Sequence, residues 1–181
     1  MKRVVAICGL PGAGKSTAID AIKNLGSVII MGDIIRNEAK KNNLEPTSEN
    51  LGKIAKELRI KYGPNIIAEK CVELIKNQSN DIIFIDGLRS MAEVKVFRKH
   101  WKFPIIAIAL EEKARFKRLF ERARSDDPKN IDDLKGRDKR EIEFGLEEVL
   151  DNADYTIKND STREDLKERI RKLVLDLIHN Y

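Results

Sequence analysis

Short runs of apolar residues recur along this 181-residue chain, separated by longer stretches of helical period. A strand with one face in water alternates apolar and polar residues, whereas a strand of a parallel sheet is covered on both faces and is apolar throughout. The sequence therefore predicts an α/β fold in which a five-stranded parallel sheet carries helices on both faces. The predicted strands are residues 4–8, 28–31, 82–85, 105–110 and 155–158.

In the segments between these runs, apolar residues recur at the spacing of an α-helix. The predicted helices are residues 15–24, 47–61, 65–77, 90–99, 111–124, 139–150 and the segment from 161 onward. The last helix begins with a capping box formed by Ser161 and Glu164. The segment 34–80 is too long for a simple crossover and contains two of the helical patterns, so we predict a helical subdomain at the sheet edge.

Composition excludes several classes of protein. The chain carries 35 Lys and Arg against 30 Asp and Glu, a net charge of +5 that is spread along the sequence. Its length suits one globular domain, and the small basic excess gives no reason to expect a nucleic-acid partner. Two cysteines are too few for a disulfide framework or a four-thiolate zinc site, and no apolar run is long enough to span a membrane. We therefore expect a cytoplasmic protein.

A glycine-rich segment between the first predicted strand and the first predicted helix matches the phosphate-binding loop pattern G-x-x-x-x-G-K-S. It consists of Gly9, Leu10, Pro11, Gly12, Ala13, Gly14, Lys15 and Ser16. Such a loop points backbone N–H groups and a helix N-terminus at phosphate. The pattern predicts a three-layer P-loop NTPase fold that binds ATP, with Lys15 on the β- and γ-phosphates, Ser16 on Mg²⁺ and Thr17 at the α-phosphate. The alternative is a glycine-rich turn without a ligand.

The guanine-binding and switch motifs of GTPases are not found in register. Residues 156–160 lack the required Asn/Thr-Lys-x-Asp order, and Asp133-Leu134-Lys135-Gly136 follows a polar stretch where the GTPase motif needs a strand.

Two further segments resemble the adenylate kinase branch of the nucleoside monophosphate kinases. Gly32-Asp33-Ile34-Ile35-Arg36 resembles the family's Gly-Asp-x-x-Arg segment. Asp86-Gly87-Leu88-Arg89 resembles its Asp-Gly-x-Pro-Arg segment, one residue shorter and without the Pro. The resemblance implies that Asp33, Arg36 and Arg89 belong to an acceptor site, where the two arginines bind the acceptor's phosphate. It also implies that Asp86 holds Mg²⁺ through water.

Basic residues after the fourth predicted strand resemble the lid of the same family. Arg118 and Arg122 resemble the pair that opens the lid, and Arg124-Ser125-Asp126-Asp127 with Arg137 resembles the segment that closes it. The resemblance makes Lys15 and these four arginines the catalytic cations. The alternative is a solvated basic face, because Arg115, Lys117, Lys139 and Arg140 are basic as well.

The resemblance also divides the single predicted domain, residues 1–181. The core would comprise 1–33, 81–117 and 138–181, the acceptor-binding helical insertion about 34–80, and the short lid about 118–137. Ala153-Asp154-Tyr155-Thr156-Ile157-Lys158-Asn159 is instead similar to the Ala-Asp-x-x-Ile-x-Asn ending of dephospho-CoA kinases. This similarity implies that Asn159 and the residues up to 162 lie beside the donor adenine. Alternatively, Asn159 shapes the turn and Ser161 caps the following helix.

Glu93 stands where adenylate kinases have a Gln that binds the acceptor base. An ionised carboxylate accepts hydrogen bonds but donates none, so Glu93 would suit a base edge with two donors. The alternative is an exposed helical Glu near Lys95.

Taken together, these features favour an ATP-dependent phosphotransferase that uses Mg²⁺ and acts on a nucleoside monophosphate or nucleotide-like acceptor. The alternatives are dephospho-CoA kinase-like activity and an ATPase switch that acts through a protein or nucleic-acid partner. The two acceptor-side arginines favour transfer, because a switch needs no second phosphate site. The acceptor and the oligomeric state stay open.

Overall fold

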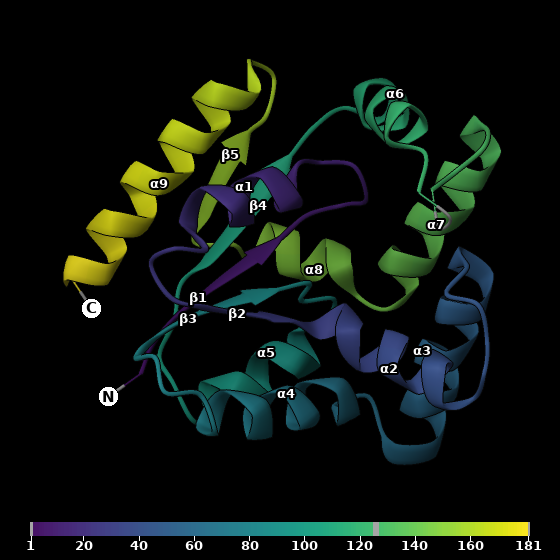
Figure 1. Cartoon of the computed structure of the whole chain (residues 1–181), viewed down its shortest axis with the longest axis horizontal. Coiled ribbons are helices and arrows are strands. Elements are labelled where there is room, and N and C mark those ends of the chain that lie inside the picture. Colours follow the sequence, from purple (N-terminus) through teal and green to yellow (C-terminus); the bar gives the residue numbers. More distant parts are fainter. Residues whose placement is uncertain (1, 125–126, 181) are drawn as a thin grey trace.

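The computed structural model describes residues 2–124 and 127–180. Five strands form one parallel sheet in the order β2-β3-β1-β4-β5 (Figure 1). They are β1 (Arg3–Cys8), β2 (Ser27–Ile30), β3 (Ile82–Asp86), β4 (Ile105–Ala109) and β5 (Tyr155–Lys158). This sheet confirms the predicted fold class, and every strand boundary lies within one residue of its predicted place.

Nine helices are formed by the described residues. They are α1 (Lys15–Ile22), α2 (Met31–Lys41), α3 (Ser48–Tyr62), α4 (Ile66–Lys76), α5 (Met91–Arg98), α6 (Glu112–Arg122), α7 (Ile131–Glu143), α8 (Leu146–Asp151) and α9 (Arg163–Asn180). In the described part of the chain, no helix combines the length and the apolar character needed to cross a membrane.

Alternate residues of the central strand β1 face two separate apolar cores, because helices cover the sheet on both sides. Val4 and Ala6 belong to a core that α4, α5 and α8 complete. Val5 and Ile7 belong to the other, which α1 and α9 complete. Figure 1 shows α1 and α9 on one side of the sheet and α4 and α5 on the other. This two-sided burial is the reason that β1 is apolar at every inner position.

The structure differs from the predicted helices in three places. β2 ends at Ile30 and α2 begins at once with Met31, so the predicted two-helix insertion contains three helices. The predicted helix 139–150 is two helices, because Gly145 has a φ of 103° that ends the helical path. α7 begins at Ile131 and includes 133–136, so these residues are helical and do not form a GTPase loop.

The cap of α9 also differs from the prediction. The backbone N–H of Asp165 donates to Thr162 Oγ1 at 3.1 Å, so Thr162 caps the helix in place of Ser161. The Ser161 hydroxyl instead bonds the side chain of Asp165.

The carboxyl ends of the strands meet at one edge of the sheet. From β1 the chain first builds β2 and β3 on one side, and only then β4 and β5 on the other. Open α/β sheets bind ligands in the crevice at such a switch point. The fold therefore brings the segments that follow β1, β3 and β5 to one place.

Candidate functional site

A cleft of about 600 Å³ opens at this edge of the sheet. Most of the residues that the sequence singled out line it. They are Gly9, Pro11, Gly12, Gly14, Lys15, Ser16, Thr17, Arg36, Asp86, Arg89, Arg118, Arg122, Arg124, Arg137 and Asn159. Leu10, Ala13, Asp33 and Glu93 are not among the residues that line the cleft.

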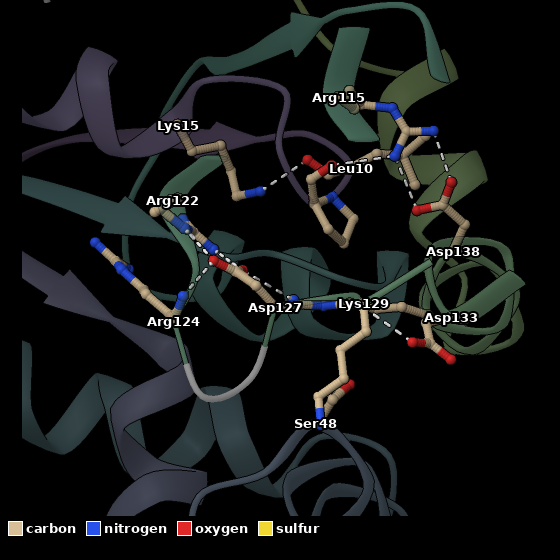
Figure 2. A network of polar contacts seen from close by, with 12 residues as sticks. Leu10, Lys15, Ser48, Arg115, Arg122, Arg124, Asp127, Lys129, Asp133 and Asp138 are labelled. Carbon is tan, nitrogen blue, oxygen red and sulfur yellow. Dashed lines mark hydrogen bonds and ion pairs between the residues drawn. The ribbon is translucent and has the colours of Figure 1, made fainter. Parts of the chain in front are cut away.

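The loop of residues 9–16 leads from β1 into α1 in a conformation that requires glycine. Gly14 has a φ of 114° and caps α1. A Cβ at this position would lie 2.2 Å from Asn159 Nδ2. Lys15 bends back over the loop, and its Nζ donates to the carbonyl of Gly9 at 2.6 Å. It also donates to the carbonyl of Leu10 at 3.2 Å (Figure 2). Ala13 lies beneath the loop and is buried.

Burial lowers the pKa of the Lys15 ammonium, and the carboxylates of Asp86 and Glu141 oppose that shift. A partly buried ammonium interacts more strongly with an anion that enters the cleft than an ammonium in bulk water does. The loop therefore offers a partly buried cation beside the N-terminus of α1, which is the arrangement that a phosphate group needs.

Asn159 ties the end of β5 to the phosphate-binding loop. Its Nδ2 donates to the Ala13 carbonyl at 2.7 Å, and the side chain is almost fully buried. Arg118 reaches the Asn159 backbone and side-chain oxygens at 3.4 and 3.5 Å. The amide nitrogen of Asn159 thus supports the loop, and the adenine-side role of residues 159–162 stays a prediction.

Gly14→Ala should destabilise the protein. A Cβ at a φ of 114° costs about 1–3 kcal/mol, and Asn159 cannot move away without losing its bond to the loop. For a chain of this size we expect the melting temperature to fall by roughly 5 °C. The matched control is Gly136→Ala inside α7, where nothing lies within 4 Å of the new Cβ. Equal melting temperatures for both variants would contradict the tight packing at Gly14.

Asp86 ends β3 beside β1, in register with Ile7. Its Oδ1 is buried and has no hydrogen-bond partner in the described part of the chain. Burial raises the pKa of this carboxyl, while Lys15, Arg89 and Arg36 act to lower it. A buried carboxylate oxygen without a partner is costly unless a cation or water satisfies it. Together with the Ser16 hydroxyl in the same cleft, Asp86 provides the oxygen donors that Mg²⁺ prefers.

Arg36 and Arg89 enter the cleft from different elements. Arg36 projects from α2, and its Nη1 donates to Asp33 at 2.8 Å. About half of each of these two side chains is exposed, so Asp33 orients Arg36 from outside the cleft. Arg89 follows β3, and its Nε donates to Glu141 Oε2 at 2.6 Å. The Glu141 carboxylate raises the pKa of Arg89.

Glu141 is a cleft residue that sequence reasoning did not single out. It lies on α7, and its side chain is only 14% exposed. Burial alone would raise the pKa of Glu141, but Arg89, Lys15 and Arg137 hold it below its usual value. Its spacing of four residues from Arg137 places both on one helix face, which is the one signal in the sequence that could have found it.

Glu93 does not have the base-binding position that its sequence context suggested. The side chain is fully buried. Oε1 accepts from Arg59 at 2.7 Å and Oε2 accepts from the Arg89 backbone N–H at 2.8 Å. The alternative of an exposed helical Glu is wrong as well. Since Arg59 lies on α3, Glu93 joins the Arg89 segment to α3. Both carboxylate oxygens of Glu93 are used within the protein, so this side chain cannot bind the base of an acceptor.

Arginines of the predicted lid converge on Asp127, whose side chain is 2% exposed. Arg122 pairs with this carboxylate, the backbone N–H of Arg124 donates to it at 3.0 Å, and Arg137 lies 3.9 Å away (Figure 2). Burial favours the neutral acid, but the arginines hold the pKa of Asp127 below its usual value. Ser125 and Asp126, which belong to the predicted lid, lie outside the described residues.

The alternative of a solvated basic face fits only some of these residues. Lys117 and Lys139 are exposed, but Arg115 is buried and bonded on every side. It donates to the Pro11 carbonyl at 3.1 Å and to the two oxygens of Asp138 at 2.9 and 2.6 Å (Figure 2). Arg115 therefore joins the phosphate-binding loop to α7, which carries Arg137 and Glu141.

The sheet order and the loop after β1 define a P-loop NTPase fold of the kinase type, and two solved structures share it. TT1252 from Thermus thermophilus matches with a TM-score of 0.63 and 18% identity, covering 97% of this chain and 98% of that one. Shikimate kinase from Acinetobacter baumannii in complex with shikimate matches with a TM-score of 0.58 and 16% identity, covering 97% and 94%. At these identities the likeness concerns the fold alone.

Relatives in sequence identify the family. A family model described as an AAA domain matches residues 5–144. A UPF0200/UPF0201 protein of Archaeoglobus fulgidus is 43% identical over 183 residues, which cover 98% of this chain and 57% of that protein. A UPF0200 protein of Methanoregula boonei is 44% identical over 179 residues, covering 98% and 96%. The chain therefore belongs to the UPF0200 family, and the AAA domain model matches most of its length. The resemblances to adenylate kinases and dephospho-CoA kinases stay predictions.

Proposed function

We propose that the protein transfers the γ-phosphoryl group of Mg·ATP to a nucleotide or nucleotide-like acceptor. The observation that carries this proposal is that the cleft contains two cations, Arg36 and Arg89, in addition to Lys15 of the phosphate-binding loop. Arg36 and Arg89 line the same cleft as the phosphate-binding loop but come from α2 and from the end of β3. A protein that only binds and hydrolyses ATP has no need for cations beyond those that contact ATP.

In this proposal the donor binds along residues 9–17. The N–H groups of the loop and of the first turn of α1 surround the phosphates, and Lys15 turns from its carbonyl partners to the β- and γ-phosphates. A cation on the transferring group matters because the charge of the transition state spreads over three equatorial oxygens.

Mg²⁺ fits the donor set that the cleft provides. Ser16 would bind the ion directly, and Asp86 would hold it through water. When bound, the ion neutralises charge that develops on the β- and γ-phosphate oxygens. The observation that supports this assignment is that Oδ1 of Asp86 is buried without a hydrogen-bond partner among the described residues.

Arg118, Arg122, Arg124 and Arg137 would act on the transferring phosphoryl group from α6 and α7. All four arginines line the cleft, which supports this role. Asp127 pairs with Arg122 and lies 3.9 Å from Arg137. Phosphoryl transfer depends mostly on positioning and charge neutralisation, so prepositioned arginines are effective without any protein nucleophile.

Two alternatives follow from other observations. The similarity of residues 153–159 to dephospho-CoA kinases favours transfer to a hydroxyl of a nucleotide-like acceptor. An ATPase switch with a protein or nucleic-acid partner would use the loop alone and leave Arg36 and Arg89 without a function. We expect the enzyme to act in the cytoplasm.

A screen of acceptors tests the proposal. Purified protein is incubated with Mg·ATP and each of the nucleoside monophosphates, deoxynucleoside monophosphates and dephospho-CoA, and ADP and phosphorylated product are separated by chromatography. Lys15→Ala serves as the blank. Transfer to at least one acceptor is expected, and ATP hydrolysis that no acceptor stimulates would contradict a kinase and support the switch.

Arg36→Ala should raise the KM of the acceptor found in that screen. A charge-assisted hydrogen bond contributes about 1.5–3 kcal/mol, which corresponds to a roughly 10- to 100-fold higher KM. The side chain is half exposed, so its truncation should leave the fold intact. Lys41→Ala, at the exposed end of the same helix, is the matched control. A KM unchanged in both variants would remove Arg36 from the acceptor site.

A further inference from the structure

Glu141 places a carboxylate among the cations of the cleft. Its Oε2 accepts from Arg89 Nε at 2.6 Å. No described residue donates a hydrogen bond to its Oε1. The residue lines the cleft together with Lys15, Arg89 and Arg137. One oxygen of Glu141 therefore orients Arg89, and the other is available to a ligand.

The charge of Glu141 does not suit a nucleophile that is itself an anion. The carboxyl keeps a low pKa because Arg89, Lys15 and Arg137 outweigh the effect of its burial, so it is ionised at neutral pH. An ionised carboxylate beside the transferring group repels a phosphate oxygen that approaches the γ-phosphorus as the nucleophile. A phosphate nucleophile also gains nothing from a proton acceptor, because it is already ionised.

A hydroxyl nucleophile, in contrast to a phosphate, needs a proton acceptor. It must lose its proton as it attacks phosphorus, and kinases that act on hydroxyls use a carboxylate to accept that proton. Such a group must lie close to the transferring phosphoryl, which in the proposed function is bound by Lys15. Glu141 is near enough to Lys15 for their charges to interact.

The other carboxylates near the cleft are less suited to this role. Asp86 occupies the predicted metal position, and Asp33 lies outside the cleft on Arg36. Both oxygens of Glu93 are bonded within the protein. Glu121 lines the cleft, but its side chain is 63% exposed at the end of α6. Glu141 combines burial, contact with the acceptor arginine and an available oxygen.

From this arrangement we propose that the acceptor is phosphorylated on a hydroxyl group whose proton passes to Glu141 Oε1. The inference rests on the proposed function and narrows its acceptor to a hydroxyl-bearing anion. The hydroxyl oxygen forms a bond to the γ-phosphorus, and the bond from that phosphorus to the β,γ-bridging oxygen breaks. ADP leaves with the electron pair, and the proton is released from Glu141 to solvent. The product is a phosphomonoester.

The test compares two kinds of nucleophile in the full-length protein. Dephospho-CoA, nucleosides and nucleoside 3′- and 5′-monophosphates offer a hydroxyl, whereas 2′,3′-dideoxynucleoside 5′-monophosphates offer only their phosphate. Phosphorus NMR of the products distinguishes a phosphomonoester from a diphosphate. We expect a phosphomonoester and no transfer to the dideoxynucleotides.

Variants then test the residue. Glu141→Gln keeps an oxygen for Arg89 but accepts a proton poorly, so kcat should fall about 10²- to 10⁴-fold with little change in acceptor KM. Glu141→Asp should retain part of the activity. Glu143→Gln makes the same chemical change at an exposed position of α7 and should match the wild type. Melting curves of all three variants check that the fold is retained.

Each outcome separates the two proposals. A diphosphate product, or transfer to a dideoxynucleotide, would overturn the inference and leave the kinase function standing. A phosphomonoester product with Glu141→Gln within threefold of wild-type kcat would also overturn the role of Glu141. No transfer to any acceptor, with ATP hydrolysis that depends on Lys15, would overturn the proposed function and the inference with it.

Discussion

Lys15→Ala lowers the rate of phosphoryl transfer by at least about 10³-fold in the outcome that we expect. Removal of a single group that stabilises transition-state charge typically costs 10²- to 10³-fold, and a cation on the transferring phosphoryl contributes more. Lys15 is the partly buried cation of the loop, and its Nζ donates to the backbone carbonyls of Gly9 and Leu10. The measurement is kcat/KM with the acceptor identified by the screen.

The same variant should not lose stability. The pKa of Lys15 is lowered because its ammonium group loses contact with water in the folded protein, which is unfavourable to folding. Truncation to Ala removes this unfavourable contribution. We expect a melting temperature equal to or above that of the wild type. Lys23→Ala, at the exposed C-terminal end of α1, is the matched control and should retain full activity. A Lys15→Ala enzyme with more than a tenth of wild-type activity would contradict the assignment of the loop.

Asp138→Ala should destabilise the protein more than any other variant described above. The change leaves the Arg115 guanidinium buried without its carboxylate, and breaking a buried pair from one side costs about 3–5 kcal/mol. In a chain of this length the melting temperature should fall by about 10 °C or more. Thermal and urea denaturation provide the measurement.

Two comparisons make this prediction specific. Glu57→Ala removes a carboxylate from an ion pair whose side chains are exposed, and it should not change the melting temperature measurably. ATP affinity should fall in Asp138→Ala, because Arg115 also supports the Pro11 carbonyl of the phosphate-binding loop. A stability loss under 1 kcal/mol would show that Arg115 finds other partners and that the pair does not secure α7.

Local patterns were sufficient for the parts of the site that follow a strand directly. The loop 9–16 needs glycine because Gly9, Gly12 and Gly14 have positive φ angles, which is a property of the loop backbone itself. Asp86 and Arg89 were singled out by the resemblance of residues 86–89 to a segment of adenylate kinases, and both line the cleft at the end of β3. α2 was missed because its first turn follows β2 without a break. The start of α7 was missed because residues 131–138 are mostly polar.

Long-range partners account for the remaining errors. Arg115 reads as one more basic residue of α6, yet its carboxylate lies 23 residues away on α7. Glu93 reads as a base-binding residue or as an exposed helical Glu, but Arg59, 34 residues earlier, buries it. No periodicity links such pairs, because they come together only when separate helices pack on the same sheet.

The sequence by itself determined the five strands of the sheet, most of the helices between them, and the loop that suits a phosphate group. These follow from the period of apolar residues and from backbone conformations that only glycine adopts easily. Tertiary structure decided which charges face the cleft and which are paired within the protein. It placed Glu141 on Arg89 across 52 residues. The reason is that burial and charge pairing depend on where distant helices pack, and that placement is a property of the whole fold.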